Sequence, residues 1–572
     1  MNAYISAATC SCPLTNSSYL ARDKGPDRIR LQSCHFPRRP PTLGLYKRMS
    51  RKSSEVLSPR ASFQPSHDGL GEPLLPRSGG EDGDGDQSGR AQLVAELGRL
   101  ARLSGPLILQ NLAGYMLSVI STAFIGHLND PVALSATVLA TSFYNITGYS
   151  LVIGLSAGME TMCGQAYGAG NYSMLGLVLQ RALLICWAAC VPIALFWTQA
   201  HRLMLALHQE PLIVAGACKY LAIATPAVFL ASVSSCLYRY LVTQQEVRPP
   251  MICTLITAAL CPAFNWLLIY KFQMGLEGAA WAFLASTATY TALLAGYTVA
   301  REVLATRADK PRRTWAGFSW QAWADWGTYL RFAAPSAAMI CMEWWIFELV
   351  IFMAGSLKDF ARIAVAVMGI SFNITSWTYM IPMSLGTAAN TRVANALGSG
   401  SAAAARTAAR TAVSAALVLQ LCLGGGLFAG QHLVARIFTS EPSIVYNVGR
   451  IMPALAASAV GDGMVAVLGG VLRGSGRQTW GAALNLVGYW AVGCPLALLL
   501  GFKLGLDVVG FWCGLAAATS LQAVILAVVV SRFDWDLEVR RAAKLVSQHA
   551  AADASTAAGE ARPQPPLADG QA

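Results

Sequence analysis

Two acidic residues stand inside long apolar stretches of this chain of 572 residues. Glu343 lies near the middle of one stretch, in the run CMEWWIFE, and Asp462 lies within another, in SAVGDGM. A charge at membrane depth is costly and usually marks an ion or proton pathway. Both acids are therefore candidates to bind and release a proton, with hydrogen bonding between helices as the alternative. Glu348 lies nearer the outer end of the stretch that holds Glu343, and we assign it an orienting or gating role.

A second group of residues suggests a gate. Glu160 closes an apolar stretch and is followed by Gly164, Gly168 and Gly170. Glycine permits positive φ angles and close approach of two backbones. We interpret this segment as a loop that gates the path or joins two lobes, with a simple turn and cap as the alternative.

Aromatic and amide side chains in the apolar stretches could line a path for an organic solute. Aromatic faces attract organic cations by about 0.5–2 kcal/mol, and amides offer hydrogen bonds. Ordinary helix packing is the alternative for each of these residues. The candidates are Gln110, Asn111, Tyr115, Asn145, Trp344, Trp345, Asn373, Trp377 and Tyr379.

Signatures of other function classes are missing from the sequence. No segment reads GxxxxGK[ST], so there is no ATP-binding P-loop. The 14 cysteines include no CxxC pair and no Cys/His cluster with zinc spacing, and no Ser/His/Asp or Cys/His arrangement suggests catalysis. We therefore expect no enzyme activity, no cofactor and no bound metal.

The composition is that of a polytopic membrane protein. Hydrophobic residues make up 55% of the chain and charged residues only 13%, whereas about 25% of the residues in soluble domains are charged. The mean hydropathy is +0.46. The net charge of +12 does not indicate a nucleic-acid partner, because Lys and Arg fall between the apolar stretches and in the tails.

Twelve apolar stretches are near or above the ~20 residues that span a bilayer as a helix. They predict an all-α fold of twelve transmembrane helices. The predicted helices are 103–126, 133–158, 175–198, 212–236, 249–271, 276–300, 329–353, 361–386, 405–429, 444–470, 480–502 and 509–531.

The chain contains an internal repeat. Gly158 aligns with Gly386, and Gly170 aligns with Gly398 at the same spacing. Each repeat holds six helices, so both are expected to insert the same way up, as two pseudo-symmetric lobes. We expect a disordered extension over 1–98, a first lobe over 99–305, a linker over 306–326, a second lobe over 327–533 and a disordered tail over 534–572.

The basic residues predict the orientation in the membrane. Segments on one side carry most of the arginines, among them Arg239, Arg392 and Arg473. Positive residues favour the cytosolic side, so both termini and the linker are expected there. The plasma membrane or the vacuolar membrane is the expected address; a transit peptide, and with it a plastid membrane, is the alternative.

Four motifs together resemble one known family. The runs GMETMCGQAYGAGNY, CMEWWIFE, RVANALGSGS and VLRGSGRQ, in this order, resemble the plant branch of the multidrug and toxic compound extrusion (MATE) transporters. The resemblance covers residues from about 99 to 533.

The resemblance implies a twelve-helix antiporter with two six-helix lobes around a central cavity. Members of this type exchange protons for organic solutes, and Glu343 and Asp462 look like the proton carriers of the plant branch. The first helix carries Gln110 and Asn111 in place of the aspartate that prokaryotic relatives often use. We expect export of a small cationic or neutral solute by a functional monomer in the lipid bilayer. A citrate-type or phytohormone exporter and a sodium-coupled antiporter are the alternatives.

Overall fold

The structure, a computed structural model, describes residues 85–307, 313–315, 317–354, 357, 361–439 and 441–560. All regular elements in these residues are helices, which confirms the all-α fold. The predictions for 1–84, for part of the linker and for 561–572 lie outside the described residues.

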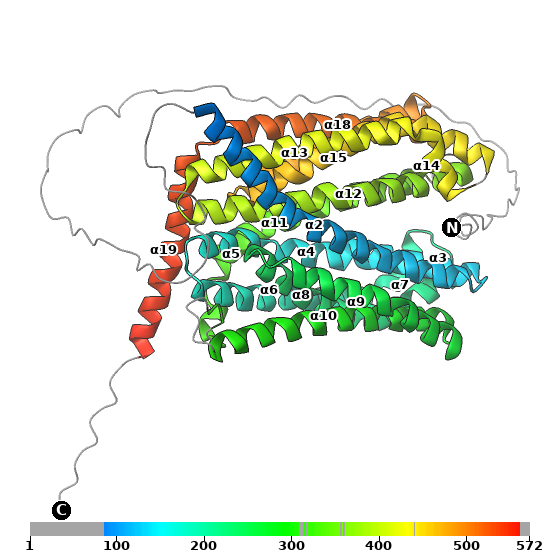
Figure 1. The fold of residues 1–572 in the computed structure, drawn as a ribbon. Helices are drawn as coiled ribbons and strands as arrows, with labels where there is room; N and C mark the ends of the chain where they lie inside the picture. The colour runs from blue at the N-terminus through cyan, green and yellow to red at the C-terminus, as the bar shows by residue number, and fades with distance from the viewer. Residues whose placement is uncertain are drawn as a thin grey trace, which may run out of the picture. The chain divides into compact units, whose positions relative to one another are not determined.

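Helices α2 to α10 correspond to the six predicted helices of the first repeat (Figure 1). Polar caps and prolines set several starts: Asp130 accepts hydrogen bonds from the N–H groups of Val132 and Ala133, and Pro131 is the first residue of α3. The elements are α2 Gly85–Gly126, α3 Pro131–Tyr144, η1 Asn145–Tyr149, α4 Ser150–Ser156, α5 Gly158–Gly168, α6 Ser173–Trp197, α7 Ala200–Ala206, α8 Pro211–Thr243, α9 Arg248–Asn265, η2 Trp266–Lys271 and α10 Gly275–Arg307.

The second repeat follows the short helix η3 (Trp320–Trp323) and is followed by the C-terminal helix α19 (Trp535–Glu560). The predicted helix 480–502 is a succession of α-helical and π-helical turns. The elements are α11 Trp326–Ala354, α12 Ala361–Gly398, α13 Ala402–Ala429, α14 Gln431–Phe438, α15 Pro442–Gly474, α16 Gln478–Asn485, η4 Leu486–Gly493, α17 Cys494–Leu498, η5 Leu499–Lys503 and α18 Asp507–Ser531.

Ten helical segments in the described part of the chain are long and apolar enough to cross a membrane. The other two predicted spans correspond to α10 and α12, which are 33 and 38 residues long. Both are less apolar because threonine, serine and tyrosine interrupt them, and α12 also contains asparagine. In α12 these polar residues include several of the candidates for the solute path.

Two boundaries of predicted disorder are wrong within the described residues. Helix α2 begins at Gly85, and its Glu96 forms a buried ion pair with Arg392 of α12 at 2.7 Å. The tail from 534 contains α19, whose Glu538 pairs with Arg477 at 2.6 Å. Both segments are polar in sequence, and an ion pair between a buried glutamate of the segment and an arginine distant in the chain holds each in place.

The first helix of each repeat begins against the core of the other repeat. Leu100 and Leu103 of α2 belong to a core cluster otherwise formed by α8, α12, α13, α15, α18 and α19, whereas Ile125 belongs to a cluster of the first repeat. Tyr329 of α11 lies in a first-repeat cluster and Ile346 in a second-repeat cluster. Figure 1 shows α2 passing from the helices of the second repeat to those of the first. The two lobes are thereby joined at their first helices.

Candidate functional site

Glu343 lies on α11 and faces α12. The hydroxyl of Tyr379 on α12 donates a hydrogen bond to Oε1 of Glu343. No salt bridge joins Glu343 to another described residue, although Arg473 is close enough to interact with it electrostatically. The structure thus brings together two residues that the sequence marked as candidates.

Asp462 of α15 is 3% exposed and is held by two hydroxyl groups. Ser458, one turn earlier, donates to Oδ2 at 3.1 Å, and Tyr489 of η4 donates to Oδ1 at 3.1 Å. Asp462 and Glu343 also interact electrostatically. The two acids are therefore electrostatic neighbours inside the second repeat.

A small cavity adjoins Asp462 between α12, α13 and α15. Its volume of about 10 Å³ is close to the minimum that holds one water molecule. Two oxygens of its lining residues, Oγ1 of Thr375 and Oε1 of Gln420, are buried without a hydrogen-bond partner. The lining is Thr375, Thr378, Tyr379, Gln420, Leu423, Ala459 and Asp462. This cavity offers oxygen ligands to a water molecule or a small cation beside the acid.

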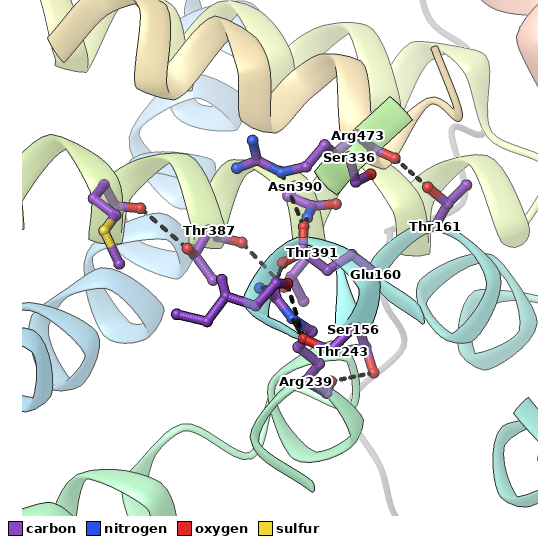
Figure 2. Close-up of polar contacts among 12 residues, drawn as sticks. Ser156, Glu160, Thr161, Arg239, Thr243, Ser336, Thr387, Asn390, Thr391 and Arg473 are labelled. Carbon is purple, nitrogen blue, oxygen red and sulfur yellow. Dashed lines mark hydrogen bonds and ion pairs between the residues drawn. The ribbon is translucent and has the colours of Figure 1, made fainter. Parts of the chain in front are cut away.

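Glu160 is the centre of a second polar cluster, which joins the two repeats (Figure 2). It forms ion pairs with Arg239 of α8 and with Arg473 of α15, the latter at 3.0 Å, and Asn390 of α12 donates a hydrogen bond to it. Arg239 also donates to Oγ of Ser156 at 2.9 Å. Glu160 is only 5% exposed, so the paired arginines compensate a buried charge.

Further hydrogen bonds cross between the repeats beside this cluster. Thr161 donates to the carbonyl of Arg473, and the Gln478 amide donates to Oγ1 of Thr161 at 2.9 Å. Gln165 donates to the carbonyl of Gly474 at 3.2 Å. Helix α5 is therefore fastened to the end of α15 and the start of α16.

Glycines let α5 and α12 touch at the same place. A Cβ at Gly168 would lie 2.1 Å from the carbonyl oxygen of Asn395, and one at Gly398 would lie 2.0 Å from that of Gln165. Gly168 and Gly398 thus play matching parts, and Gly170 matches Gly400, both with positive φ, at 75° and 79°. The predicted pairing of Gly170 with Gly398 is wrong by two residues at this point of the repeat.

The predicted gating loop is mostly helix. Glu160, Gly164 and Gly168 lie in α5, which follows a single turn residue, Ala157, and extends ten residues beyond the second predicted helix. Only Gly170 lies in the turn that follows, with the left-handed conformation expected of glycine. The contact between lobes that the segment was expected to make is present, and helix residues make it.

Comparison with known proteins decides the family. The MatE family model matches residues 106–267 and 335–499, one segment in each repeat. The chain belongs to the MatE family of transporters. It is therefore an integral membrane protein with two matching repeats, as the helices indicate.

The MatE chain matches three quarters or more of the length of each of three relatives. Protein DETOXIFICATION 16 of Arabidopsis thaliana is 34% identical over 467 residues, which are 81% of this chain and 94% of that protein. Multidrug and toxin extrusion protein 2 of Mus musculus is 35% identical over 440 residues, 77% of this chain and 75% of that protein. The crystal structure of the eukaryotic MATE transporter AtDTX14 is 33% identical, with a TM-score of 0.74, and covers 80% of this chain and 100% of that one.

Several solute-path candidates of this MatE chain lie together between α2 and α12. Tyr115 donates a hydrogen bond to Oδ1 of Asn373 at 2.9 Å, and its ring meets that of Trp377 edge-on at 5.3 Å. Asn111 donates to Oγ of Ser384 at 2.8 Å. Gln110 faces another helix and donates to the hydroxyl of Tyr290 on α10 at 3.3 Å.

The remaining candidates lie elsewhere. Trp345 donates to the carbonyl of Ile146 at 3.0 Å, and the ring of Trp344 contacts that of Tyr149 at 6.2 Å. The side chain of Asn145 is exposed, and that of Glu348 is partly exposed. Neither forms a hydrogen bond or an ion pair with another candidate, so the structure groups them with neither acid.

Sequence reasoning missed three members of the Glu160 cluster. The sequence predicts Arg239 and Arg473 in connecting segments, where they indicate orientation, yet both lie in helices, and Arg239 is only 8% exposed. Asn390 is not among the residues that the sequence predicts for a site. The signal in the sequence was a lone acid at a helix end with arginines on the same side of the membrane, which together favour an ion pair.

Proposed function

We propose that the protein is a proton-coupled antiporter that exports organic solutes from the cytosol, with cationic or neutral compounds as substrates. The observation that carries the proposal is the pair of acids in the second repeat. Each accepts a hydrogen bond from a tyrosine, and neither forms a salt bridge with another described residue. The names of the relatives, which include detoxification proteins and a multidrug and toxin extrusion protein, support efflux of toxic compounds.

Glu343 and Asp462 are the proton-binding groups in this proposal. Because they interact electrostatically, proton binding by one changes the proton affinity of the other. Ionised acids favour a cationic solute in the cavity between the lobes. Protons arriving from the acidic side remove that charge and release the solute there.

Arg473 links the proton site to the contact between the lobes. Its guanidinium pairs with Glu160 and also interacts with Glu343. Ionised Glu343 competes with Glu160 for this cation, and protonation of Glu343 ends the competition. Proton binding in one lobe thereby changes the strength of the contact between the two.

The Glu160 cluster is the cytosolic gate in this proposal. Both termini lie in the cytosol, and the gate is closed where α5 meets α12 and α15. Alternating access then means that the lobes separate at this cluster and close at their other end. We propose that a monomer does this, in the plasma membrane or the vacuolar membrane.

Sodium coupling is the second candidate, and the cavity beside Asp462 favours it. A carboxylate together with the unpaired oxygens of Thr375 and Gln420 is a ligand set suited to a hard cation. An exporter of organic anions is less favoured, because the acids lie where the solute's charge would be repelled.

Transport by the purified protein in vesicles tests the proposal. With an imposed pH gradient, the parent protein should accumulate tetraethylammonium, and a protonophore should abolish the accumulation. Glu343→Gln, which keeps the size of the side chain without its titratable group, should not accumulate it. Equal accumulation by Glu343→Gln would contradict the proton role. Accumulation that follows a sodium gradient at fixed pH would establish sodium coupling in its place.

A further inference from the structure

A cavity of about 320 Å³ lies at the end of the second repeat where α18 finishes and α19 begins. It is separate from both acids and from the Glu160 cluster. Three helices of the repeat and the start of α19 contribute to its wall. The lining is Arg406, Ala409, Arg410, Val413, Ser414, Leu468, Ala527, Val530, Ser531, Phe533 and Trp535.

Two guanidinium groups share this cavity. Arg406 and Arg410 are one turn apart on α13, so they lie on the same face of the helix. Both side chains are exposed, and neither forms an ion pair or a side-chain hydrogen bond with another described residue. Asp534, beside the aromatic wall, is engaged as the cap of α19, where it accepts from the N–H groups of Asp536 and Leu537 at 3.1 Å. Two like charges one turn apart repel each other, which favours an anion between them.

Apart from Ser414 and Ser531, the other lining residues are apolar or aromatic, and the cavity adjoins the lipid-facing surface. Leu468 and Trp535 are buried in its wall. On α13 the face that carries Arg406 and Arg410 continues to Ser414 and then to Val418, which is 65% exposed. On α18 Val528 is exposed next to the cavity. The surface therefore changes from basic to hydroxyl to apolar along the helix, in the order of a phospholipid from phosphate to acyl chain.

We propose that this cavity binds the phosphate headgroup of an anionic glycerophospholipid of the surrounding bilayer. The two guanidinium groups hold the phosphate, for which arginine offers paired N–H donors. The hydroxyls of Ser414 and Ser531 face the glycerol, and the acyl chains lie along α13 and α18. Basic pockets between membrane helices are suited to such headgroups. A free phosphate has no apolar part that could contact the adjoining apolar surface.

The test is lipid binding to the full-length protein in a neutral detergent, measured by native mass spectrometry. Dioleoyl phosphatidylglycerol is the anionic probe, dioleoyl phosphatidylcholine the neutral one, and glycerol 1-phosphate the soluble one. The parent protein should prefer phosphatidylglycerol to phosphatidylcholine. Arg406→Gln/Arg410→Gln should weaken phosphatidylglycerol binding about 30-fold, since each surface arginine is expected to contribute about fivefold.

The matched control is Arg532→Gln/Arg540→Gln, which removes two exposed arginines outside the cavity. This variant should bind phosphatidylglycerol within about twofold of the parent, a difference too small to reflect a lost arginine contact. If the double variant in the cavity does not fold, the single variants Arg406→Gln and Arg410→Gln provide the test. Each should weaken phosphatidylglycerol binding about fivefold. Undiminished binding by the cavity variants would overturn the proposal. Glycerol 1-phosphate binding as tightly as the lipid would overturn the lipid assignment.

Discussion

Glu343 and Asp462 differ in how the protein holds them. Asp462 is almost fully buried and accepts hydrogen bonds from two hydroxyls of its own repeat, whereas Glu343 has one such bond and interacts with the guanidinium of Arg473. In the proposed mechanism Asp462 is therefore the internal proton site, and Glu343, which interacts with both Asp462 and Arg473, connects it to the contact of the lobes. Glu160, by contrast, is an acid with two arginine partners. Its charge is compensated, which suits a gate better than a proton carrier.

The first prediction concerns Asp462→Asn. The amide can still accept hydrogen bonds from Ser458 and Tyr489, so the protein should fold normally. Without a titratable group in this position, accumulation of tetraethylammonium driven by a pH gradient should fall to the level of empty vesicles. Ser458→Ala is the control and should retain accumulation, because Tyr489 still holds the carboxylate. Full activity of Asp462→Asn would remove Asp462 from the proton pathway.

A second prediction concerns the gate. Glu160→Gln leaves Arg239 and Arg473 without their carboxylate and should lower stability by about 3–5 kcal/mol, as loss of one partner of a buried pair does. Thermal unfolding of the purified protein measures this loss. Glu277→Gln is the control: its pair with Lys219, at 3.8 Å, is exposed and should contribute about 0–1 kcal/mol. Equal melting of the two variants would contradict a buried ion cluster.

At the scale of elements, glycines let α5 and α12 pack closely, and an ion pair between Glu538 and Arg477 holds α19 on the rest of the protein. Helix α19 packs on the second repeat through Trp535 and Ala542, and its Leu545 reaches a core cluster of the first repeat. Glu538 near its start is paired with Arg477 and Arg541. One polar helix outside the membrane-spanning segments therefore contacts both repeats.

A third prediction tests the helix contact. Gly168→Ala places a methyl group against the backbone of α12 and should cost about 1–3 kcal/mol, as overpacking does. Gly398→Ala should behave alike, because Gln165 occupies the corresponding place. Gly114→Ala in α2 is the matched control, since nothing lies within 4 Å of the added methyl. If thermal unfolding shows the same loss of stability for Gly114→Ala as for the other two variants, α5 and α12 do not pack at these glycines.

A fourth prediction concerns pH and α19. Burial raises the pKa of Glu538 even though Arg477 opposes this effect. When folding raises the pKa of an acid, the folded state binds more protons than the unfolded one. Its stability therefore falls as pH rises from the ordinary pKa to the raised one, by about 1.4 kcal/mol for each pH unit between the two values. Docking of α19 should thus weaken over this acidic range and stay constant above it. Hydrogen exchange of α19, corrected for intrinsic rates, measures this, and Glu538→Gln should lose the dependence. Stronger docking at higher pH would contradict the assignment.

The sequence predicted the elements better than their contacts. Each predicted span is present as a helical segment, since a long stretch of apolar residues is enough to indicate a membrane helix. Both acids could be selected from the sequence because charged residues are rare within such stretches. The Glu160 cluster was missed because Arg239 and Asn390 come close to Glu160 only when distant helices pack. The extent of α2 and the existence of α19 depend likewise on partners distant in the chain, Arg392 and Arg477.

At the scale of the whole molecule, the Glu160 cluster joins the two repeats, and the first helix of each repeat also packs against the core of the other. Helices α2 and α11 each pass from the core of one repeat to that of the other. The two acids proposed to bind protons lie in the second repeat, and Arg473 extends from this repeat to Glu160 of the first. This arrangement lets a proton in one lobe act on the contact that both lobes form.

Proton movement driven by the solute is the decisive measurement for coupling through Glu343. Vesicles that contain the protein and a pH-sensitive dye receive a tetraethylammonium gradient with no pH gradient. We predict that the parent protein moves protons against the direction of the cation, and that Glu343→Gln moves none. Equal proton movement by Glu343→Gln, or cation transport by the parent without any proton movement, would contradict proton antiport through this residue.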